Sequence, residues 1–202
     1  MSTTTNRLSY ASAYAVAEAC IDEIADSCVQ TVIAGSLRRH EPTAGDVEIV
    51  AVPIIELRHE RDLFGEVVKT IPVDRLHARL TTLADNEIVR PRVRDDGRLV
   101  SWGPAWKALT FDGVRVDLFT PDAGRFGWIL ALRTGPAAFS RQLVVERGHT
   151  TRDGRPGFLP PFIRPADGWL TRSLSGERIE TPHERDVFDL FDLPYPQPAE
   201  RR

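Results

Sequence analysis

One apolar segment that begins with two acids constrains the fold of this chain more than any other feature. Residues 46–53 read DVEIVAVP, so Asp46 and Glu48 stand at the head of a run that is apolar over residues 49–52. Such a run, stopped by Pro53, predicts a central strand that is buried on both faces beyond its first residues. Side chains two residues apart on a strand share a face, so the two carboxylates project together.

Two like charges side by side are costly to bury, and a divalent cation with oxygen ligands is the usual compensation. The best candidate for a third acid is Asp117, in the second strand of a predicted hairpin. This hairpin joins AWKALTF to VRVDLF through Asp112-Gly113, a dipeptide that favours a two-residue type I′ turn. If the hairpin pairs beside the acidic strand, Asp46, Glu48 and Asp117 would hold one or two Mg²⁺ ions.

A Gly-Ser turn followed by two arginines precedes the acidic strand. Gly35 allows close approach of the backbone, and Ser36 with the amides after it can hold phosphate oxygens at the start of a short helical turn. Arg39 is a bidentate partner for phosphate, and Arg38 lies beside the same loop. A lone Asp-x-Glu is more often a solvated strand edge and a lone Gly-Ser only a turn. Together they supply the parts that phosphoryl transfer requires.

The rest of the chain predicts strands and helices in two parts, with a change to helices after Pro121 that starts a small second subdomain. A last helix is expected after a capping box formed by Thr181 and Glu184. Residues 54–71 show no clean period. Helices are expected over residues 13–28, from near 72 to 83, over 125–132, 136–147 and 181–191. Strands are expected over residues 30–34, 46–52, 88–93 and 99–102, in the hairpin of 105–119, and in a second hairpin over 169–180 that turns at 175–176.

Composition narrows the classes of function. No apolar run approaches the roughly 20 residues that cross a bilayer, and no basic region followed by an apolar stretch opens the chain, so we expect no membrane and a cytoplasmic location. The net charge of -3 argues against coating nucleic acid by bulk charge and leaves local patches such as Arg90, Arg92 and Arg94. Cys20 and Cys28 are expected to be reduced core residues of the first helix.

The motifs together resemble a known signature. GSLRR and GDVEI, followed later by VDLF, are similar to the nucleotidyltransferase motif of the family X DNA polymerases, which include DNA polymerase beta. LRTGPAAF (132–139) is similar to the family's Tyr-Phe-Thr-Gly segment, and ERDVFDLFDLPYPQPAERR resembles its C-terminal ending. The likeness covers nearly the whole chain, and the overall form looks most like the short stand-alone members of bacteriophages and bacteria.

This resemblance implies an α+β fold. Residues 1–122 would form the catalytic palm, a mixed β-sheet with helices on one face, and residues 123–202 a thumb-like, nucleotide-selecting subdomain of helices and a short hairpin. Asp46, Glu48 and Asp117 would be the catalytic residues and the ligands of two Mg²⁺ ions, with Mn²⁺ as the alternative metal. The nucleoside triphosphate would be bound by Gly35, Ser36, Arg38, Arg39, Gly45, Thr134 and Gly135.

The implied activity is transfer of a nucleotide from a (deoxy)nucleoside triphosphate to a 3′-hydroxyl of DNA, in gap filling or repair. Leu132 and Arg133 replace the aromatic pair that often screens the sugar 2′-position, so discrimination against ribonucleotides is not implied. Ala137 and Ser140 replace polar groups that commonly face the base and the minor groove, so we expect low fidelity. Nothing in the sequence corresponds to the N-terminal DNA-anchoring domains of longer members, so DNA binding would rest on this core or on a partner.

Other readings of the same motifs remain open. The acceptor could be RNA, a small molecule or a protein hydroxyl, or the enzyme could be a terminal transferase that needs no template. A binding module with a degenerate site is a third reading, against which the complete acid triad speaks. The sequence does not specify the acceptor, the sugar preference, the oligomeric state or any protein partner.

Overall fold

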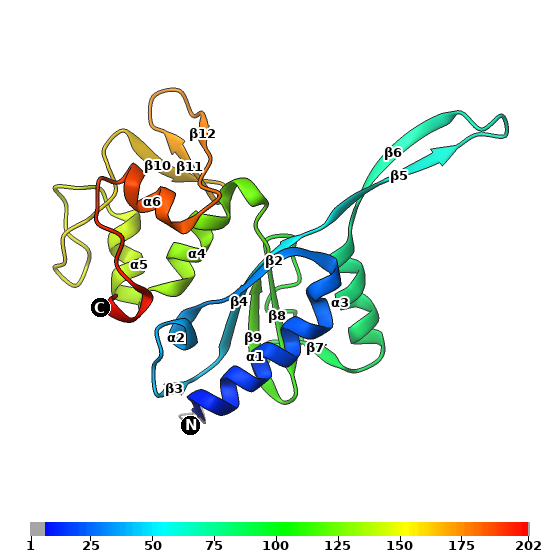
Figure 1. The fold of residues 1–202 in the computed structure, drawn as a ribbon, viewed down its shortest axis with the longest axis horizontal. Coiled ribbons are helices and arrows are strands. Elements are labelled where there is room, and N and C mark those ends of the chain that lie inside the picture. The colour runs from blue at the N-terminus through cyan, green and yellow to red at the C-terminus, as the bar shows by residue number, and fades with distance from the viewer. Residues whose placement is uncertain (1–6, 202) are drawn as a thin grey trace.

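The computed structural model describes residues 7–201 and places them in a central sheet, a projecting hairpin and a C-terminal group of helices and short strands (Figure 1). This is a mixed α+β fold, as the sequence predicts. The helices are α1 (Tyr10–Ile24), α2 (Gly35–Arg38), α3 (Arg75–Asp85), α4 (Phe126–Thr134), α5 (Ala137–Val144) and α6 (Glu184–Leu190). The strands are β1 (Leu8–Ser9), β2 (Cys28–Ile33), β3 (Thr43–Ala44), β4 (Val47–Pro53), β5 (Ile55–Arg61), β6 (Val67–Asp74), β7 (Val89–Pro91), β8 (Trp106–Phe111), β9 (Val114–Phe119), β10 (Ile163–Ala166), β11 (Trp169–Arg172) and β12 (Arg178–Ile179).

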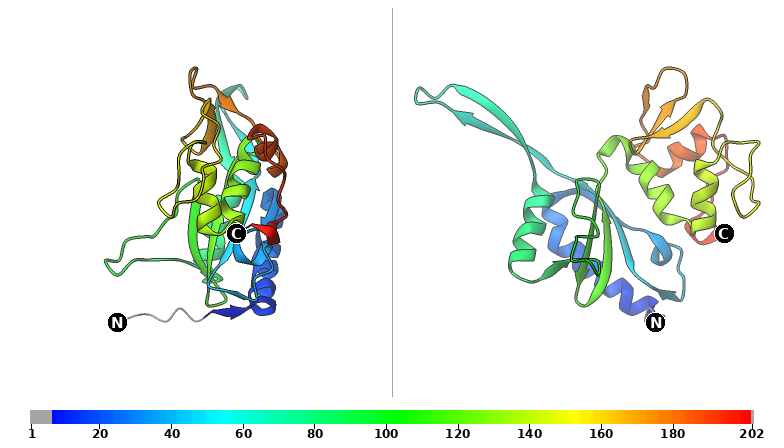
Figure 2. Two further views of the ribbon diagram at one scale, coloured as in Figure 1. Left: turned by 90° about the vertical axis from the view of Figure 1, so that its left-hand side faces the viewer. Right: turned by 180° about the vertical axis from the view of Figure 1, so that it is seen from behind.

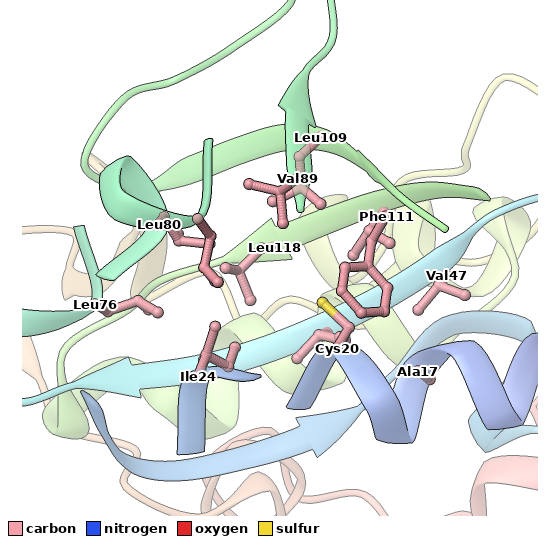
Figure 3. Close-up of a cluster of buried hydrophobic side chains, with 14 of the residues drawn as sticks. Ala17, Cys20, Ile24, Val47, Leu76, Leu80, Val89, Leu109, Phe111 and Leu118 are labelled. Carbon is pink, nitrogen blue, oxygen red and sulfur yellow. The ribbon is translucent and has the colours of Figure 1, made fainter. Parts of the chain in front are cut away.

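The central sheet has five strands in the order β2-β4-β9-β8-β7. Strands β4 and β9 run parallel and the other neighbours run antiparallel, so the sheet is mixed. Helices α1 and α3 cover one face, where their apolar side chains meet those of the sheet (Figure 3). Cys20 and Ile24 of α1 and Leu76 and Leu80 of α3 lie in this buried cluster. The expected central strand is therefore β4, which is buried between neighbours on both sides.

The opposite face of the sheet is not bare. Alternation along β4 sends Val47 and Ile49 toward α1 and α3, and sends Glu48 and Val50 to the other side. There α4 packs on the sheet, and its Leu130 joins a small cluster with residues of β4 and β9. The expectation of helices on one face holds for α1 and α3, while α4 reaches the other face from the C-terminal part.

The turn between β8 and β9 forms as the sequence predicts. Asp112 has φ of 48° and Gly113 has φ of 74°, which matches the two left-handed positions of a type I′ turn. The hairpin pairs beside β4, so Asp117 lies opposite Glu48 on the neighbouring parallel strand.

The first helix ends earlier than its periodicity suggests. Helix α1 ends at Ile24, a 3₁₀ turn covers Ala25–Ser27, and β2 begins at Cys28. Cys28 therefore lies on a strand rather than on the helix, and the two cysteines are both free thiols. The apolar Cys28 fits either a helix or a strand, because the half-buried start of β2 follows directly in sequence the apolar positions that α1 buries against the sheet.

Residues 54–71, which show no clean period in the sequence, lie in a long hairpin formed by β5 and β6 (Figures 1 and 2). Every residue of β5 is exposed, so neither of its faces leaves a burial pattern in the sequence. Pro72 lies inside β6 rather than at a helix start. Helix α3 begins at Arg75 instead, with the Asp74 carboxylate accepting a hydrogen bond from the backbone N–H of His77 at 2.8 Å.

The C-terminal part has its own buried cluster, which includes Trp128, Leu143 and Phe188. The predicted hairpin β11–β12 is present, and β10 pairs with β11 as a third strand that the sequence analysis does not predict. Of the two strands expected after α3, only Val89–Pro91 forms, and helix α5 ends at Val144, three residues early.

Helix α6 starts differently from the sequence expectation. Its capping box is formed by His183 and Asp186, because the helix begins at Glu184 rather than immediately after Thr181. The two large buried clusters lie on either side of the expected boundary at residues 122 and 123, which stays a prediction. Within residues 7–201, none of the helices combines the length and the apolar character needed to span a membrane.

Candidate functional site

Most of the residues predicted from the motifs line a single cleft of about 840 Å³. Its walls come from the α2 turn and the start of β4 on one side, and from the end of α4 and the start of α5 on the other. The structure thus brings together segments about 90 residues apart in the chain. The predicted residues on this lining are Ser36, Arg39, Gly45, Asp46, Glu48 and Gly135.

Gly35 and Glu48 are fitted closely to each other. Gly35 has φ of +62°, a conformation that side chains rarely adopt, and a Cβ added there would lie 2.0 Å from Oε2 of Glu48. The backbone N–H of Ala34 donates to the carbonyl oxygen of Glu48 at 2.8 Å. The glycine is therefore required twice, by the turn and by the carboxylate that lies against it.

Glu48 is the most perturbed carboxyl in the cleft. Burial, and then the negative charge of Asp46, raises the pKa of Glu48 to about 7. Arg133 opposes the shift of this pKa, Asp117 adds to it, and Arg39 opposes it more weakly. These couplings indicate a cluster of three acids with two arginines close to it, as the strand register implies.

Asp117 is held by two side chains that the motifs do not contain. The Trp106 indole Nε1–H donates to Oδ1 of Asp117 at 3.1 Å, and the Arg92 guanidinium forms an ion pair with the same oxygen. Arg92 follows β7, whose pairing with β8 places it beside Ala108, the register partner of Asp117. Asp117 is not among the residues that line the cleft.

The three acids are of the type that binds a metal ion, but their side chains are not arranged around a common point. Carboxylate oxygens are the ligands that Mg²⁺ prefers. Among residues 7–201, however, no group of three or more His, Cys, Asp or Glu side chains is arranged to hold a metal ion. The ion pair with Arg92 accounts for part of this, because it occupies one oxygen of Asp117.

Arg38 and Thr134 lie outside the cleft lining and connect the two parts of the molecule. Arg38 donates to Oγ1 of Thr134 at 2.6 Å and to both carboxylate oxygens of Glu184 at 2.9 and 2.8 Å. The buried Arg201 and the Tyr195 hydroxyl also donate to Glu184, each at 2.6 Å. Burial would raise the pKa of Glu184, but the hydrogen bonds from the two arginines outweigh it and hold this pKa low.

Arg39 contacts the C-terminal part of the molecule and also lines the cleft. Its guanidinium donates to the backbone carbonyl of Thr134 at 2.8 Å. Its buried Nε makes no hydrogen bond within residues 7–201, although the Glu41 carboxylate lies 3.6 Å away as an ion-pair partner. A buried donor without a hydrogen bond is costly unless a ligand satisfies it. This atom is consistent with an anion-binding role for Arg39.

Sequence reasoning missed most of the positive charge in this cleft. Arg115 stands two residues before Asp117 on β9 and so shares its face, a signal that strand alternation offers. Arg115 also donates to the carbonyl of Gly45 at 2.9 Å. Arg7 comes from the chain start and Arg141 from α5, where no local pattern marks them. Arg133 lies in the LRTGPAAF segment, but the sequence indicated it only as the replacement of an aromatic residue. The four added arginines are Arg7, Arg115, Arg133 and Arg141.

An arginine-rich cleft with acids at its base can bind a polyanion and place it against carboxylates. No known protein-family model matches the chain.

Proposed function

We propose that this chain is a nucleotidyltransferase that moves a nucleotide from a nucleoside triphosphate to a 3′-hydroxyl of DNA, as a family X-like polymerase in gap filling or repair. One observation carries the proposal. A single cleft contains the Ser36 and Arg39 turn together with Asp46 and Glu48, and Asp117 is in register with Glu48 on the neighbouring strand. Residues 1–122 would serve as the palm and residues 123–202 as the thumb.

The turn of α2 would bind the triphosphate. Ser36 can donate a hydroxyl hydrogen to a phosphate oxygen, and Arg39 can present two parallel N–H groups. Gly45 and Gly135 lie on facing walls of the same cleft. A Cβ added at Gly135 would lie 2.6 Å from the Phe139 ring, so this glycine allows the end of α4 to pack closely against α5. Arg38 and Thr134 would act indirectly, by fixing the wall that carries Gly135 against the α2 turn.

The acids would act on the reacting groups. Asp46 and Glu48, joined by Asp117 once its contact with Arg92 opens, would hold Mg²⁺. Bound Mg²⁺ would neutralise the triphosphate and polarise the attacking hydroxyl. The acceptor oxygen forms a bond to the α-phosphorus, the bond to the β-phosphate breaks, and pyrophosphate leaves with the electron pair. Asp117 would orient the hydroxyl and accept its proton.

Two arginines on the face of the sheet that carries Asp117 support a nucleic-acid acceptor over a small molecule. Arg90 and Arg115 both pair with Thr110 across the sheet, so the three side chains share one face with Asp117 two residues further along. Arg90 is 74% exposed. Arg90 and Arg115, beside the acids, can each bind a phosphate of a DNA strand.

The proposal is tested with a primed, gapped duplex, each labelled nucleoside triphosphate in turn, and Mg²⁺. We expect extension of the primer by the wild type and loss of extension in Asp117→Asn. Asp95→Asn, in an exposed loop, is the matched control and should extend normally. Absence of both extension and nucleotide binding in the wild type would overturn the proposal.

The same assay separates the other acceptors. Extension of a single strand without a template would identify a terminal transferase, and extension of an RNA primer alone would identify RNA as the acceptor. Label on the protein itself, with no extended strand, would indicate transfer to a protein hydroxyl.

A further inference from the structure

Arg133 has an unusual position between two cavities. It lies near the end of α4, and its Cζ is 3.9 Å from the centroid of the Phe119 ring. It lines both the main cleft of about 840 Å³ and a second pocket of about 270 Å³. Phe119 stands two residues after Asp117 on β9, so stacking on this ring places the guanidinium on the same face of the sheet as the acid.

The guanidinium has donors to spare. An arginine side chain carries five N–H donors, yet Arg133 makes no hydrogen bond or ion pair at contact distance within residues 7–201. Arg92 and Arg115, on the same face, are both engaged, with Asp117 and with the carbonyl of Gly45. Burial lowers the pKa of Arg133, while the negative charges of Glu48 and Asp117 raise it.

We propose that Arg133 is a catalytic residue whose guanidinium binds the α-phosphoryl group during transfer. This inference rests on the proposed function. With the terminal phosphates on Ser36 and Arg39 and the attacking hydroxyl on Asp117, the reacting phosphorus lies between the α2 turn and β9. Arg133 and Arg141 line the opposite wall of the cleft. Arg141 is paired with Asp153 at 3.2 Å, whereas Arg133 lies on the face of the sheet that carries Asp117.

The chemistry favours such a group. As the acceptor oxygen bonds to the α-phosphorus and the bond to the leaving pyrophosphate breaks, charge is spread over the oxygens of the transferred group. A planar guanidinium, fixed flat on an aromatic ring, can donate two N–H groups to those oxygens with little reorganisation. The stacking on Phe119 restricts the side chain before substrate arrives.

The experiment compares kcat and KM of wild type, Arg133→Ala, Arg133→Gln and Arg133→Lys on the gapped duplex. We expect kcat of Arg133→Ala and Arg133→Gln to fall about 100-fold, with a much smaller change in KM for the nucleotide. Arg133→Lys should recover part of kcat. The matched control is Arg178→Ala, which removes another stacked guanidinium, 5.1 Å above the Trp169 ring and outside both cavities, and should keep full activity.

Two further measurements exclude a structural role. Guanidinium ion added to Arg133→Ala should restore kcat several-fold, whereas urea, which is neutral and of the same shape, should not. Binding of Mn²⁺ alone, measured by electron paramagnetic resonance without nucleotide, should be as tight as in wild type or tighter, because a positive charge beside Glu48 and Asp117 has been removed.

The inference would be overturned by a kcat of Arg133→Ala and Arg133→Gln within threefold of wild type, by equal rescue with urea, or by weaker Mn²⁺ binding that parallels the loss of activity. If Arg133→Ala does not fold, judged by circular dichroism, Arg133→Gln decides, because it keeps the aliphatic stem and a polar end group. A wild type that transfers no nucleotide to any acceptor would instead sink the proposed function, and this inference with it. An active wild type with fully active variants removes only the role of Arg133.

Discussion

At the scale of single residues, Glu48 is a site where stability and proposed function oppose each other. Its pKa of about 7 means that the native state holds the proton more tightly than the unfolded chain does. The free energy of unfolding therefore falls as the pH rises from about 4.5 to about 7, and the full penalty is present above that range. We predict that Glu48→Gln, without metal, stabilises the protein by about 2 kcal/mol at pH 8 and has little effect at pH 4.5.

Chemical denaturation at the two pH values measures this difference. Glu60→Gln, on the exposed β5, is the matched control and should change neither value. An equal effect of Glu48→Gln at both pH values would show that ionisation of Glu48 is not the cause. The same variant should abolish nucleotidyl transfer, because a neutral amide is a poor substitute for a carboxylate beside a metal.

Gly35 gives a second prediction at this scale. Gly35→Ala should destabilise the protein by about 1 kcal/mol through its left-handed backbone, and should also displace the Glu48 carboxylate. Gly97→Ala is the control for the backbone effect, since Gly97 has φ of +78° and nothing within 4 Å of an added Cβ. We expect similar losses of backbone stability but loss of activity only in Gly35→Ala. Full activity of Gly35→Ala would contradict the close fit of these two residues.

Local motifs predicted the parts of the site that lie close together in sequence. Ser36, Arg39, Asp46 and Glu48 all line the cleft because a short turn and one strand carry them. The Arg92 contact with Asp117 was not predictable in the same way, because it depends on how β7 pairs with β8, a long-range pairing that no local pattern specifies.

At the scale of elements, strong hydrophobic patterns predicted correctly whether a segment is a helix or a strand, but they predicted the ends of these elements less accurately. The Asp112-Gly113 turn and the amphipathic faces of α1 and α3 were predictable because burial on one side imposes a period. The end of α1 was not, because its apolar stripe passes without interruption into β2 at Cys28. The hairpin β5–β6 escaped prediction because burial selects none of the residues of β5.

The exposed hairpin yields the third prediction. Replacing residues 58–71 by a two-residue turn should change the free energy of unfolding by less than about 1 kcal/mol, because none of these residues belongs to a buried cluster. The shortened hairpin keeps Ile55 paired with Asp74 at the start of β5 and the end of β6. It also keeps the hydrogen bond from the N–H of Arg75 to the carbonyl of Ile54 at 3.0 Å, so α3 still begins at the same residue. Urea denaturation of the shortened chain, compared with wild type, measures the change; a loss of several kcal/mol would mean that the hairpin supports the fold.

At the scale of the whole molecule, two large apolar cores are joined by the small apolar cluster between α4, β4 and β9 and by a polar junction. The larger core lies between the central sheet and its two helices, and the second lies among α4, α5 and α6. Glu184 sits where they meet, bound by Arg38 from the first part and by Arg201 from the end of the chain. Arg38 and Glu184 are 146 positions apart, so their pairing could not be read from the sequence.

The last prediction concerns this junction. Glu184 is 5% exposed and Arg201 is fully buried, so Glu184→Gln leaves buried positive charge without its counter-charge while it preserves shape. We expect the free energy of unfolding to fall by about 3–5 kcal/mol at pH 7. Differential scanning calorimetry of the variant and the wild type measures this fall.

The pH dependence of the same variant distinguishes the charge from the shape. The pKa of Glu184 is lowered in the folded protein, so its ionised form stabilises the native state above the pKa of a free glutamate, about 4.3, and that contribution is lost as the pH falls. The difference between wild type and Glu184→Gln should therefore shrink below about pH 4. Glu177→Gln, which removes an exposed ion pair with Arg172, is the control and should cost less than about 1 kcal/mol at either pH. A difference that persists in acid would show that the carboxylate holds the two cores together by packing rather than by its charge.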